Sequence, residues 1–204
     1  MSSEDVLKMV ADEVAVCTSC ALHHSRKNAV PGEGPAHADL MFIGEGPGFH
    51  ENEQGRPFVG AAGKFLEELL GSIALTREQV FIGNVVKCRP PGNRDPQPEE
   101  VSACSGYLER QIEAINPKVI VTLGRFSMAR YFPDAKISKI HGQPKVVDGR
   151  LIVPMYHPAA ALHQPSLRSV VEADFARLPA LIEQGSHQAP AGGDAAGPEQ
   201  LSLF

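Results

Sequence analysis

Apolar and polar positions along the chain form blocks that predict strands and helices in turn. Short, continuous apolar runs, typical of buried parallel strands, lie at residues 39–44, 80–86 and 118–124. Segments with apolar residues on one side predict helices at residues 1–16, 61–72, 98–115, from the end of the third run to about Phe132, and 167–184. This alternation predicts an α/β fold, a three-layer α/β/α sandwich with a central, mostly parallel sheet of about four strands.

Local signals support several of these boundaries. Pro98, followed by Glu99 and Glu100, is typical of a helix start, and Asn116-Pro117 of a helix end. Asp148-Gly149 lies between two further apolar runs, residues 143–147 and 150–156, and predicts a hairpin.

Polar residues interrupt or follow the apolar runs at three places. A Gly-rich loop, residues 44–48 (GEGPG), follows the first run, Asn84 lies near the end of the second, and His157 ends the second arm of the hairpin. In open parallel sheets, ligands bind beyond the carboxyl ends of the strands. The sequence therefore predicts a binding site where these three places meet.

Each candidate in this site also has an ordinary structural explanation. The Gly-rich loop alone could be a simple turn, and it lacks the patterns of nucleotide-phosphate loops. Phe58 and His157 could be core residues, and Asn84 could bond to loop backbone. Glu45 is the residue of the loop that most specifically indicates a functional site, since a carboxylate at the end of a strand seldom serves packing. Together, a carboxylate, an aromatic ring, an amide and a histidine predict a pocket for a flat polar heterocycle.

Length and composition indicate one globular domain. The 204 residues include 43% hydrophobic and 21% charged side chains, which is ordinary for a folded protein. With no long apolar run and an acidic start, the chain is predicted to be soluble, cytoplasmic and without a membrane partner. We expect a folded domain at residues 1–184, a flexible Gly/Ala/Pro linker at 185–199 and an apolar peptide at 200–204.

The net charge of −5 does not favour a nucleic-acid partner, but its distribution weakens that objection. All 19 Lys and Arg precede residue 178, whereas three acidic residues follow it. Basic residues also gather near predicted loops, namely Arg56, Lys64, Lys87, Arg89 and Arg94. A local basic patch is compatible with this pattern, although composition alone does not establish one.

The four cysteines indicate a metal centre. Cys17 and Cys20 form a CxxC pair, and Cys88 and Cys104 lie further along the chain. Four thiols in a chain without an export signal are more typical of metal ligands than of disulfides. A zinc ion and a 4Fe–4S cluster both fit the count, and four buried free cysteines are the remaining alternative.

Five motifs, in this order, resemble those of family 4 uracil-DNA glycosylases, the iron–sulfur class. They are GEGPG, GRPFVG, NVVKCRPP, VTLG and HPA, and the likeness covers about residues 10–182. The resemblance implies a monofunctional DNA repair enzyme that flips uracil out of DNA and hydrolyses its N-glycosidic bond. It also implies a 4Fe–4S cluster, with ligands Cys17, Cys20, Cys88 and Cys104. A non-catalytic DNA-binding module and a redox protein are the competing functions.

The resemblance assigns roles to the pocket residues. Phe58 would stack on the flipped base and Asn84 would hydrogen-bond to uracil N3–H and O4. His157 would donate to uracil O2, and Glu45 would stabilise the sugar cation or position the attacking water. The segment 48–51 would close the corner beside C5 against thymine. The substrate-binding set also includes Glu51 and, where better-known relatives have a catalytic Asp, Gly46.

The last five residues, 200–204 (QLSLF), resemble the peptide by which bacterial repair and replication proteins dock on the DNA polymerase sliding clamp. In this hypothesis Gln200 would bond at the rim of the clamp pocket, and Leu203 and Phe204 would fill an apolar cleft. The partners expected are therefore uracil-containing DNA and the sliding clamp, with the chain itself a monomer.

Overall fold

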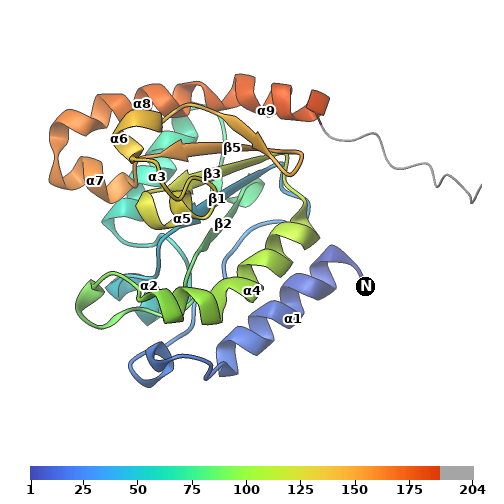
Figure 1. The fold of residues 1–204 in the computed structure, drawn as a ribbon, viewed down its shortest axis with the longest axis vertical. Helices are drawn as coiled ribbons and strands as arrows, with labels where there is room; N and C mark the ends of the chain where they lie inside the picture. Colours follow the sequence, from blue (N-terminus) through green and yellow to red (C-terminus); the bar gives the residue numbers. More distant parts are fainter. Residues whose placement is uncertain (189–204) are drawn as a thin grey trace, which may run out of the picture.

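A five-stranded sheet forms the centre of the molecule in the part of the chain that the computed structural model describes, residues 1–188 (Figure 1). The strand order is β2-β1-β3-β5-β4. The strands are β1 Leu40–Gly44, β2 Phe81–Asn84, β3 Val119–Leu123, β4 Lys145–Val147 and β5 Arg150–Met155. The first four in the spatial order run parallel, and β4 pairs antiparallel with β5. The prediction of a mostly parallel sheet is confirmed.

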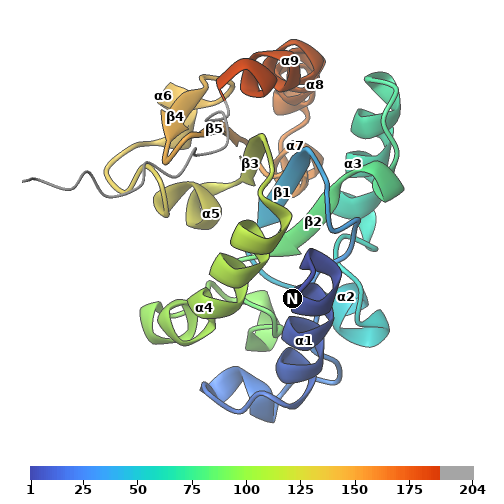
Figure 2. The ribbon, with the colours of Figure 1, turned by 90° about the vertical axis from the view of Figure 1, so that its right-hand side faces the viewer.

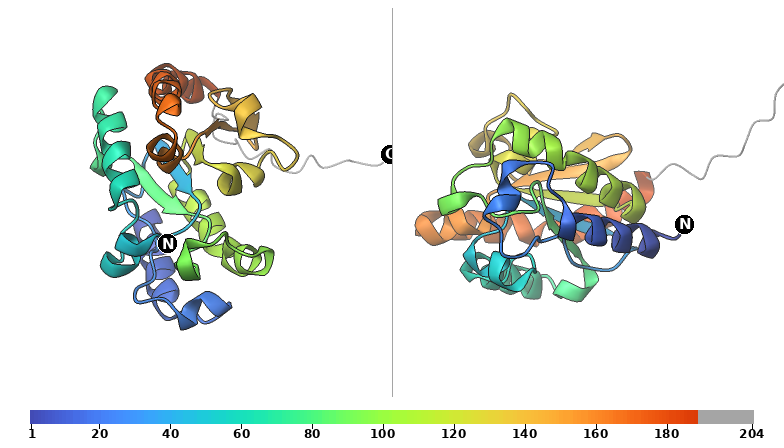
Figure 3. Two further views of the ribbon diagram at one scale, coloured as in Figure 1. Left: turned by 90° about the vertical axis from the view of Figure 1, so that its left-hand side faces the viewer. Right: turned by 90° about the horizontal axis from the view of Figure 1, so that it is seen from below.

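Helices cover both faces of this sheet. They are α1 Ser3–Val16, α2 Phe49–Gln54, α3 Ala61–Ser72, α4 Pro98–Ile115, α5 Arg125–Ala129, α6 Ile137–Ile140, α7 Pro158–His163, α8 Arg168–Ala176 and α9 Leu178–Gln188. In Figure 2, α3, α8 and α9 lie on one side of the sheet and α4 on the other, with α1 alongside α4. Figure 3 shows the same separation between α1, in blue, and the orange to red α8 and α9. The fold is therefore the predicted three-layer sandwich.

The side chains of β1 show how one apolar strand supports two cores. Leu40 and Phe42 join the core that contains α3 and α8, whereas Met41 and Ile43 join the core that contains α4. Successive side chains of a strand point to opposite faces, so a strand covered on both sides must be apolar throughout. This explains why the sequence shows unbroken apolar runs.

The helix boundaries of α4 follow the predicted signals. Glu100 accepts a hydrogen bond from the backbone N–H of Gln97 at 2.8 Å, and Asn116 ends the helix with a positive φ of 48°. Within the described residues, none of the helices is both long and apolar enough to cross a membrane.

Several predicted boundaries were wrong. The predicted strand 80–86 ends at Asn84, after which the backbone N–H groups of Val85 and Val86 bond to the carbonyls of Gly44 and Glu45. The sheet has five strands in the described chain where about four were expected, a minor difference that leaves the predicted architecture unchanged. The segment after residue 48, where no helix was predicted, forms α2.

The last predicted helix, 167–184, is two helices. α8 ends at Ala176 and α9 begins at Leu178, because Pro179 has no backbone N–H to continue the ladder. The second helix continues to Gln188, four residues into the predicted linker 185–199. The rest of that linker and the predicted peptide 200–204 lie outside the described residues.

Candidate active site

A cavity of about 440 Å³ opens at the carboxyl ends of the parallel strands. Its walls come from the segments that follow β1, β2 and β5 and from the loop before α3. All six residues predicted for the active site line it, namely Glu45, Gly46, Glu51, Phe58, Asn84 and His157. The structure therefore brings the predicted residues together, while their individual roles stay predictions.

Gly44, the last residue of β1, allows the side chains of Asn84 and Phe58 to pack close together. A Cβ at this position would lie 2.4 Å from Asn84 Oδ1 and 2.8 Å from the Phe58 ring. Gly44 pairs directly with Asn84 in the sheet, so the two strands hold the amide beside the ring. Any larger residue here would separate them.

Asn84 presents an unused hydrogen-bonding group. The residue is only 2% exposed, and its Oδ1 has no hydrogen-bond partner within the described chain. Its backbone carbonyl accepts a bond from Lys87 Nζ at 3.0 Å, which fixes the main chain beneath the amide. Leaving a buried acceptor unpaired costs about 1–3 kcal/mol, so the arrangement is consistent with a ligand that supplies the donor.

His157 lies immediately before α7 and caps it. Its Nδ1 accepts a hydrogen bond from the backbone N–H of Ala159 at 3.1 Å, so in the neutral ring the proton is on Nε2. Burial lowers the pKa of His157 to about 4, although the charge of Glu51 acts in the opposite direction. The ring is therefore neutral near pH 7 and has one N–H to donate.

Two carboxylates in the cavity differ in their surroundings. Burial and the charge of Asp95 raise the pKa of Glu45, and Arg125 opposes them. Glu51 instead accepts three backbone N–H groups, from Gly48 at 3.1 Å and from Val59 and Gly60 at 2.9 Å each. Its carboxylate ties the start of α2 to the segment before α3, a contact that the sequence did not predict.

Other lining residues had weaker signals or none. Arg94, one of the basic residues near the predicted loops, lines the cavity and forms a double hydrogen bond with Glu100 at 2.9 and 2.7 Å. His163 lies at the end of α7, in a helix that the sequence analysis missed. Two of the other basic residues do not form a free patch, since Lys87 is 1% exposed and Arg56 pairs with Glu33.

The four cysteines line a second, smaller cavity between α1, the segment after β2 and α4. Three of the sulfur atoms have N–H groups directed at them. Arg26 Nη1 lies 3.3 Å from Cys88 Sγ, the Lys87 backbone N lies 3.3 Å from Cys104 Sγ, and the Ser19 backbone N lies 3.5 Å from Cys17 Sγ. Such donors stabilise charge on thiolates, so these residues fit a thiolate-bound group.

Burial raises the pKa values of two cysteines but does not decide that of Cys17. Burial raises the pKa of Cys88, and it raises that of Cys104 to about 11 against the opposing charge of Lys87. The pKa of Cys17 is lowered, because its hydrogen bonds with Ser19 and Tyr107 outweigh burial. Within residues 1–188, no three His, Cys, Asp or Glu side chains converge to hold a single metal ion.

The comparisons with known proteins agree with this geometry. Residues 31–177 match the family model described as the uracil DNA glycosylase superfamily. The chain therefore belongs to the uracil DNA glycosylase superfamily.

Within that superfamily, the chain is similar to type-4 uracil-DNA glycosylases. It is 50% identical to the protein of that name from Sulfurisphaera tokodaii over 184 residues, 85% of this chain and 84% of that protein. The one from Archaeoglobus fulgidus is 47% identical over 87% of this chain and 92% of its own length. The one from Thermotoga maritima is 44% identical over 89% and 97%. The family predicted from the sequence motifs is thus confirmed.

Proposed function

We propose that this chain is a DNA repair glycosylase that hydrolyses the N-glycosidic bond of uracil and leaves an abasic site. The observation that carries this proposal is the buried Oδ1 of Asn84, which has no hydrogen-bond partner among residues 1–188 and belongs to a side chain that lines one cavity with Phe58 and His157. The type-4 glycosylases that match nearly the whole folded chain support the same activity. A base must leave the DNA stack to enter such a cavity.

Recognition of uracil would rest on Phe58 and Asn84. The ring would stack on the base, while the amide accepts N3–H through Oδ1 and donates to O4 through its amino group. Cytosine reverses this donor and acceptor pattern, so the buried amide would be left unpaired against it. Sites that depend on such pairing discriminate by roughly 10⁴-fold. The segment at Gly48 and Glu51 borders the cavity and would exclude the methyl group of thymine.

Bond cleavage leaves negative charge on uracil O2 and positive charge on the sugar. Neutral His157 would donate its Nε2–H to O2, and the bond from the Ala159 N–H to Nδ1 holds the ring in the required tautomer. Glu45 would stabilise the sugar cation or position the water that attacks it. In that role Glu45 must be ionised, and its raised pKa sets the pH below which the charge is lost.

The four cysteines would hold a 4Fe–4S cluster, in line with the motifs of the family. When bound, the cluster would supply cross-links between chain segments, because hydrolysis requires no electron transfer. Cys17 and Cys20 follow α1, Cys88 follows β2, and Cys104 lies within α4, so the ligands would join three segments. Metal analysis distinguishes iron from zinc, and an iron–sulfur protein is brown whereas a zinc protein is colourless.

The activity is tested with single- and double-stranded oligonucleotides that contain one uracil. After incubation with the protein, alkali should cleave the DNA only at the uracil position, and a matched oligonucleotide with thymine should stay intact. Retardation of the oligonucleotide in a gel without cleavage would instead identify the alternative, a non-catalytic DNA-binding module.

A second proposal concerns a partner, the DNA polymerase sliding clamp, and rests on the sequence at residues 200–204. These residues lie outside the described part of the chain. A peptide of this size would bind in the micromolar range, about −8 kcal/mol. Deleting 200–204 should abolish clamp binding in a titration and leave uracil excision on short oligonucleotides unchanged. Clamp binding that survives the deletion would refute this docking role.

A further inference from the structure

Phe58 has an unusual backbone for a bulky residue. Its φ is +51°, in the left-handed region, and its side chain is only 5% exposed. The ring stacks against His157 with centroids 5.4 Å apart and an interplanar angle of 25°. Residues other than glycine rarely adopt this backbone unless the surrounding structure holds them there. The position of the proposed stacking ring therefore depends on whatever holds residue 58.

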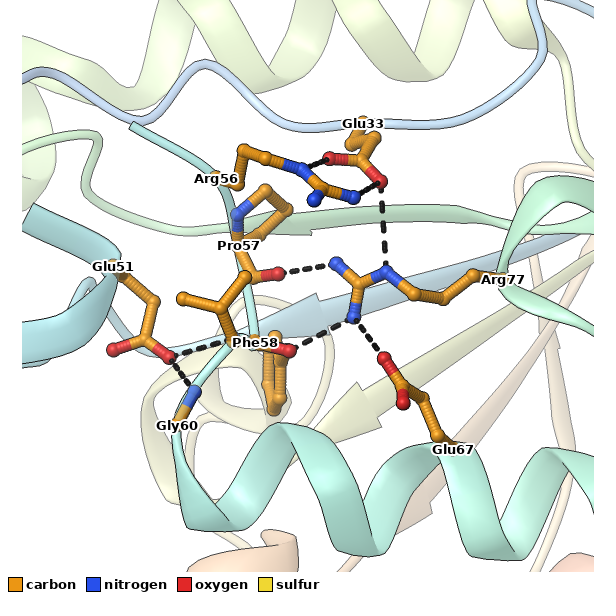
Figure 4. A network of polar contacts seen from close by, with 9 residues as sticks. Glu33, Glu51, Arg56, Pro57, Phe58, Gly60, Glu67 and Arg77 are labelled. Atoms are coloured by element: carbon orange, nitrogen blue, oxygen red, sulfur yellow. Dashed lines mark hydrogen bonds and ion pairs between the residues drawn. The ribbon is translucent and has the colours of Figure 1, made fainter. Parts of the chain in front are cut away.

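Arg77 holds the backbone of Phe58 from the side away from the cavity. Its Nη1 donates to the carbonyl of Phe58 at 2.8 Å, and its Nη2 donates to the carbonyl of Pro57 (Figure 4). One planar guanidinium thus bonds to two consecutive carbonyls and fixes the peptide between them. Rotating that peptide to the ordinary backbone region would break this pair of bonds.

Carboxylates in turn hold the guanidinium. Arg77 Nε lies 3.5 Å from Glu33, and Arg77 Nη1 lies 3.4 Å from Glu67, as Figure 4 shows. Glu33 also pairs with Arg56 through two bonds of 2.6 and 2.7 Å. The side chain of Arg77 is only 9% exposed, so it is fixed by its partners and shielded from solvent.

The other side of the same segment is also restrained. Glu51 accepts the N–H groups of Val59 and Gly60. Gly63 allows the Phe58 carbonyl to approach α3, since a Cβ at Gly63 would lie 1.8 Å from that oxygen. Arg77 itself belongs to the short 3₁₀ turn Arg77–Gln79 before β2 and does not line the cavity. Its direct link to a residue of the cavity is therefore the pair of bonds to the carbonyls of residues 57 and 58.

We propose that Arg77 is a positioning residue for the uracil-excision reaction, because it keeps Phe58 in the left-handed backbone that places its ring against the flipped base. This inference rests on the proposed function. Without the guanidinium, the backbone of Phe58 relaxes, the ring leaves its stack with His157, and base stacking is lost. The loss is then the same loss that removing the ring would cause.

A double-mutant cycle tests this dependence. Single-turnover excision of uracil is measured for Arg77→Ala, Phe58→Ala and the double variant. Each single variant should lose about 10- to 100-fold, the range expected for one base–aromatic stack. The double variant should be no slower than Phe58→Ala, since Arg77 has nothing left to position. A double variant whose loss is the product of the two single losses overturns the proposal.

Arg56→Gln is the matched control. Arg56 shares the carboxylate of Glu33 but bonds to neither carbonyl of the Phe58 segment. Excision by this variant should stay within about twofold of the unmodified protein, as for surface ion pairs generally. If Arg56→Gln loses as much activity as Arg77→Ala, the ion-pair network and not the two carbonyl bonds is responsible, and the proposal is wrong.

Thermal unfolding identifies variants that do not fold. If Arg77→Ala is unfolded, Arg77→Lys enters the same cycle, because an ammonium group retains a charge near Glu33 but cannot fork to two carbonyls. An unmodified protein without excision activity would overturn the proposed function itself. An active unmodified protein with additive losses would overturn only the role of Arg77.

Discussion

The cavity at the strand ends, or base cavity, and the cavity lined by the four cysteines, or cysteine region, both include residues of the segment after β2. They differ in whether their polar groups already have hydrogen-bond partners. In the first, Asn84 Oδ1 is buried without a partner in the described residues, and the His157 ring keeps an N–H free to donate. In the second, N–H groups from Arg26, Lys87 and Ser19 already meet the sulfurs. The difference fits the two proposals above, an exchangeable base in the first region and a permanently held cluster in the second.

Lys87 lies between the two regions and connects them. It is 1% exposed, and its Nζ donates to the carbonyl of Asn84 at 3.0 Å and to Gln111 Oε1 at 2.7 Å. Its backbone N–H points at Cys104 Sγ. Damage to the cysteine region should therefore reach the base cavity, whereas loss of a side chain in the base cavity should leave the cysteines in place.

The largest effect is expected for Cys88→Ser. Loss of one of the four proposed ligands should release the proposed cluster and lower the free energy of unfolding by more than about 4 kcal/mol, because loss of a metal is among the most destabilising single changes. Excision should fall with it, since the segment that carries Asn84 loses its anchor. Metal content, chemical denaturation and the uracil assay measure the three quantities. Removal of metal by a chelator with full excision retained would contradict the proposed connection.

His157→Ala should impair the base cavity and leave the cysteine region intact. Excision should fall by about 10²–10³-fold, as for other donors to a developing negative charge. Metal content should be unchanged, and stability should fall by only about 1 kcal/mol for the lost helix cap. His157→Asn is the control that can keep the cap without the imidazole ring, and it should be equally slow. Full activity in His157→Ala would exclude the O2 role.

Asn84→Asp should weaken the preference of the protein for uracil over cytosine. A carboxylate accepts from the amino group of cytosine but repels O4 of uracil, so the ratio of uracil to cytosine excision should fall by roughly 100-fold. The cysteine region should again be unaffected, because the backbone carbonyl that Lys87 binds remains. The ratio is measured on oligonucleotides that differ only at the target base. An unchanged ratio would remove Asn84 from base recognition.

The smallest expected effect is the contribution of His157, in the base cavity, to the pH dependence of the free energy of unfolding. His157 has a pKa of about 4 in the folded chain and an ordinary value of 6.5, so the unfolded state binds more protons between these values. The contribution of His157 to the free energy of unfolding is therefore complete above pH 6.5 and is lost as the pH falls through 4. Its size is about 2 kcal/mol after allowance for the partial exposure of the residue. His157→Gln should remove this part of the pH dependence in denaturant titrations at pH 7 and 4.5. Identical pH dependence in both proteins would show that the ring is not shielded.

The sequence predicted those features that depend on neighbouring residues. The apolar runs, the start of α4 at Pro98 and the hairpin at Asp148 are local signals, and the structure agrees with them. Asn84 and His157 were found because both interrupt or end apolar runs at the carboxyl ends of strands. The break before α9 was also local, and the absence of a backbone N–H at Pro179 could have indicated it.

What could not be predicted depends on contacts between distant segments. Nothing near Phe58 in the sequence indicates a left-handed backbone, since the guanidinium that holds it comes from residue 77. The three backbone bonds of Glu51 likewise join two loops whose distance is fixed only by packing. The pattern of apolar and polar residues cannot predict such contacts, because the contacts depend on the tertiary fold.

The strand order of the sheet also has a consequence for how the molecule assembles during synthesis. Parallel strands pair only after long crossover connections are complete, and a chain emerges from the ribosome with its N-terminal part first. All four cysteines precede residue 105, whereas β5 and the cavity residues after it, His157, Ala159 and His163, come much later in the chain. A nascent chain therefore carries every cysteine before it can form the base cavity, so insertion of the proposed cluster can precede the appearance of activity.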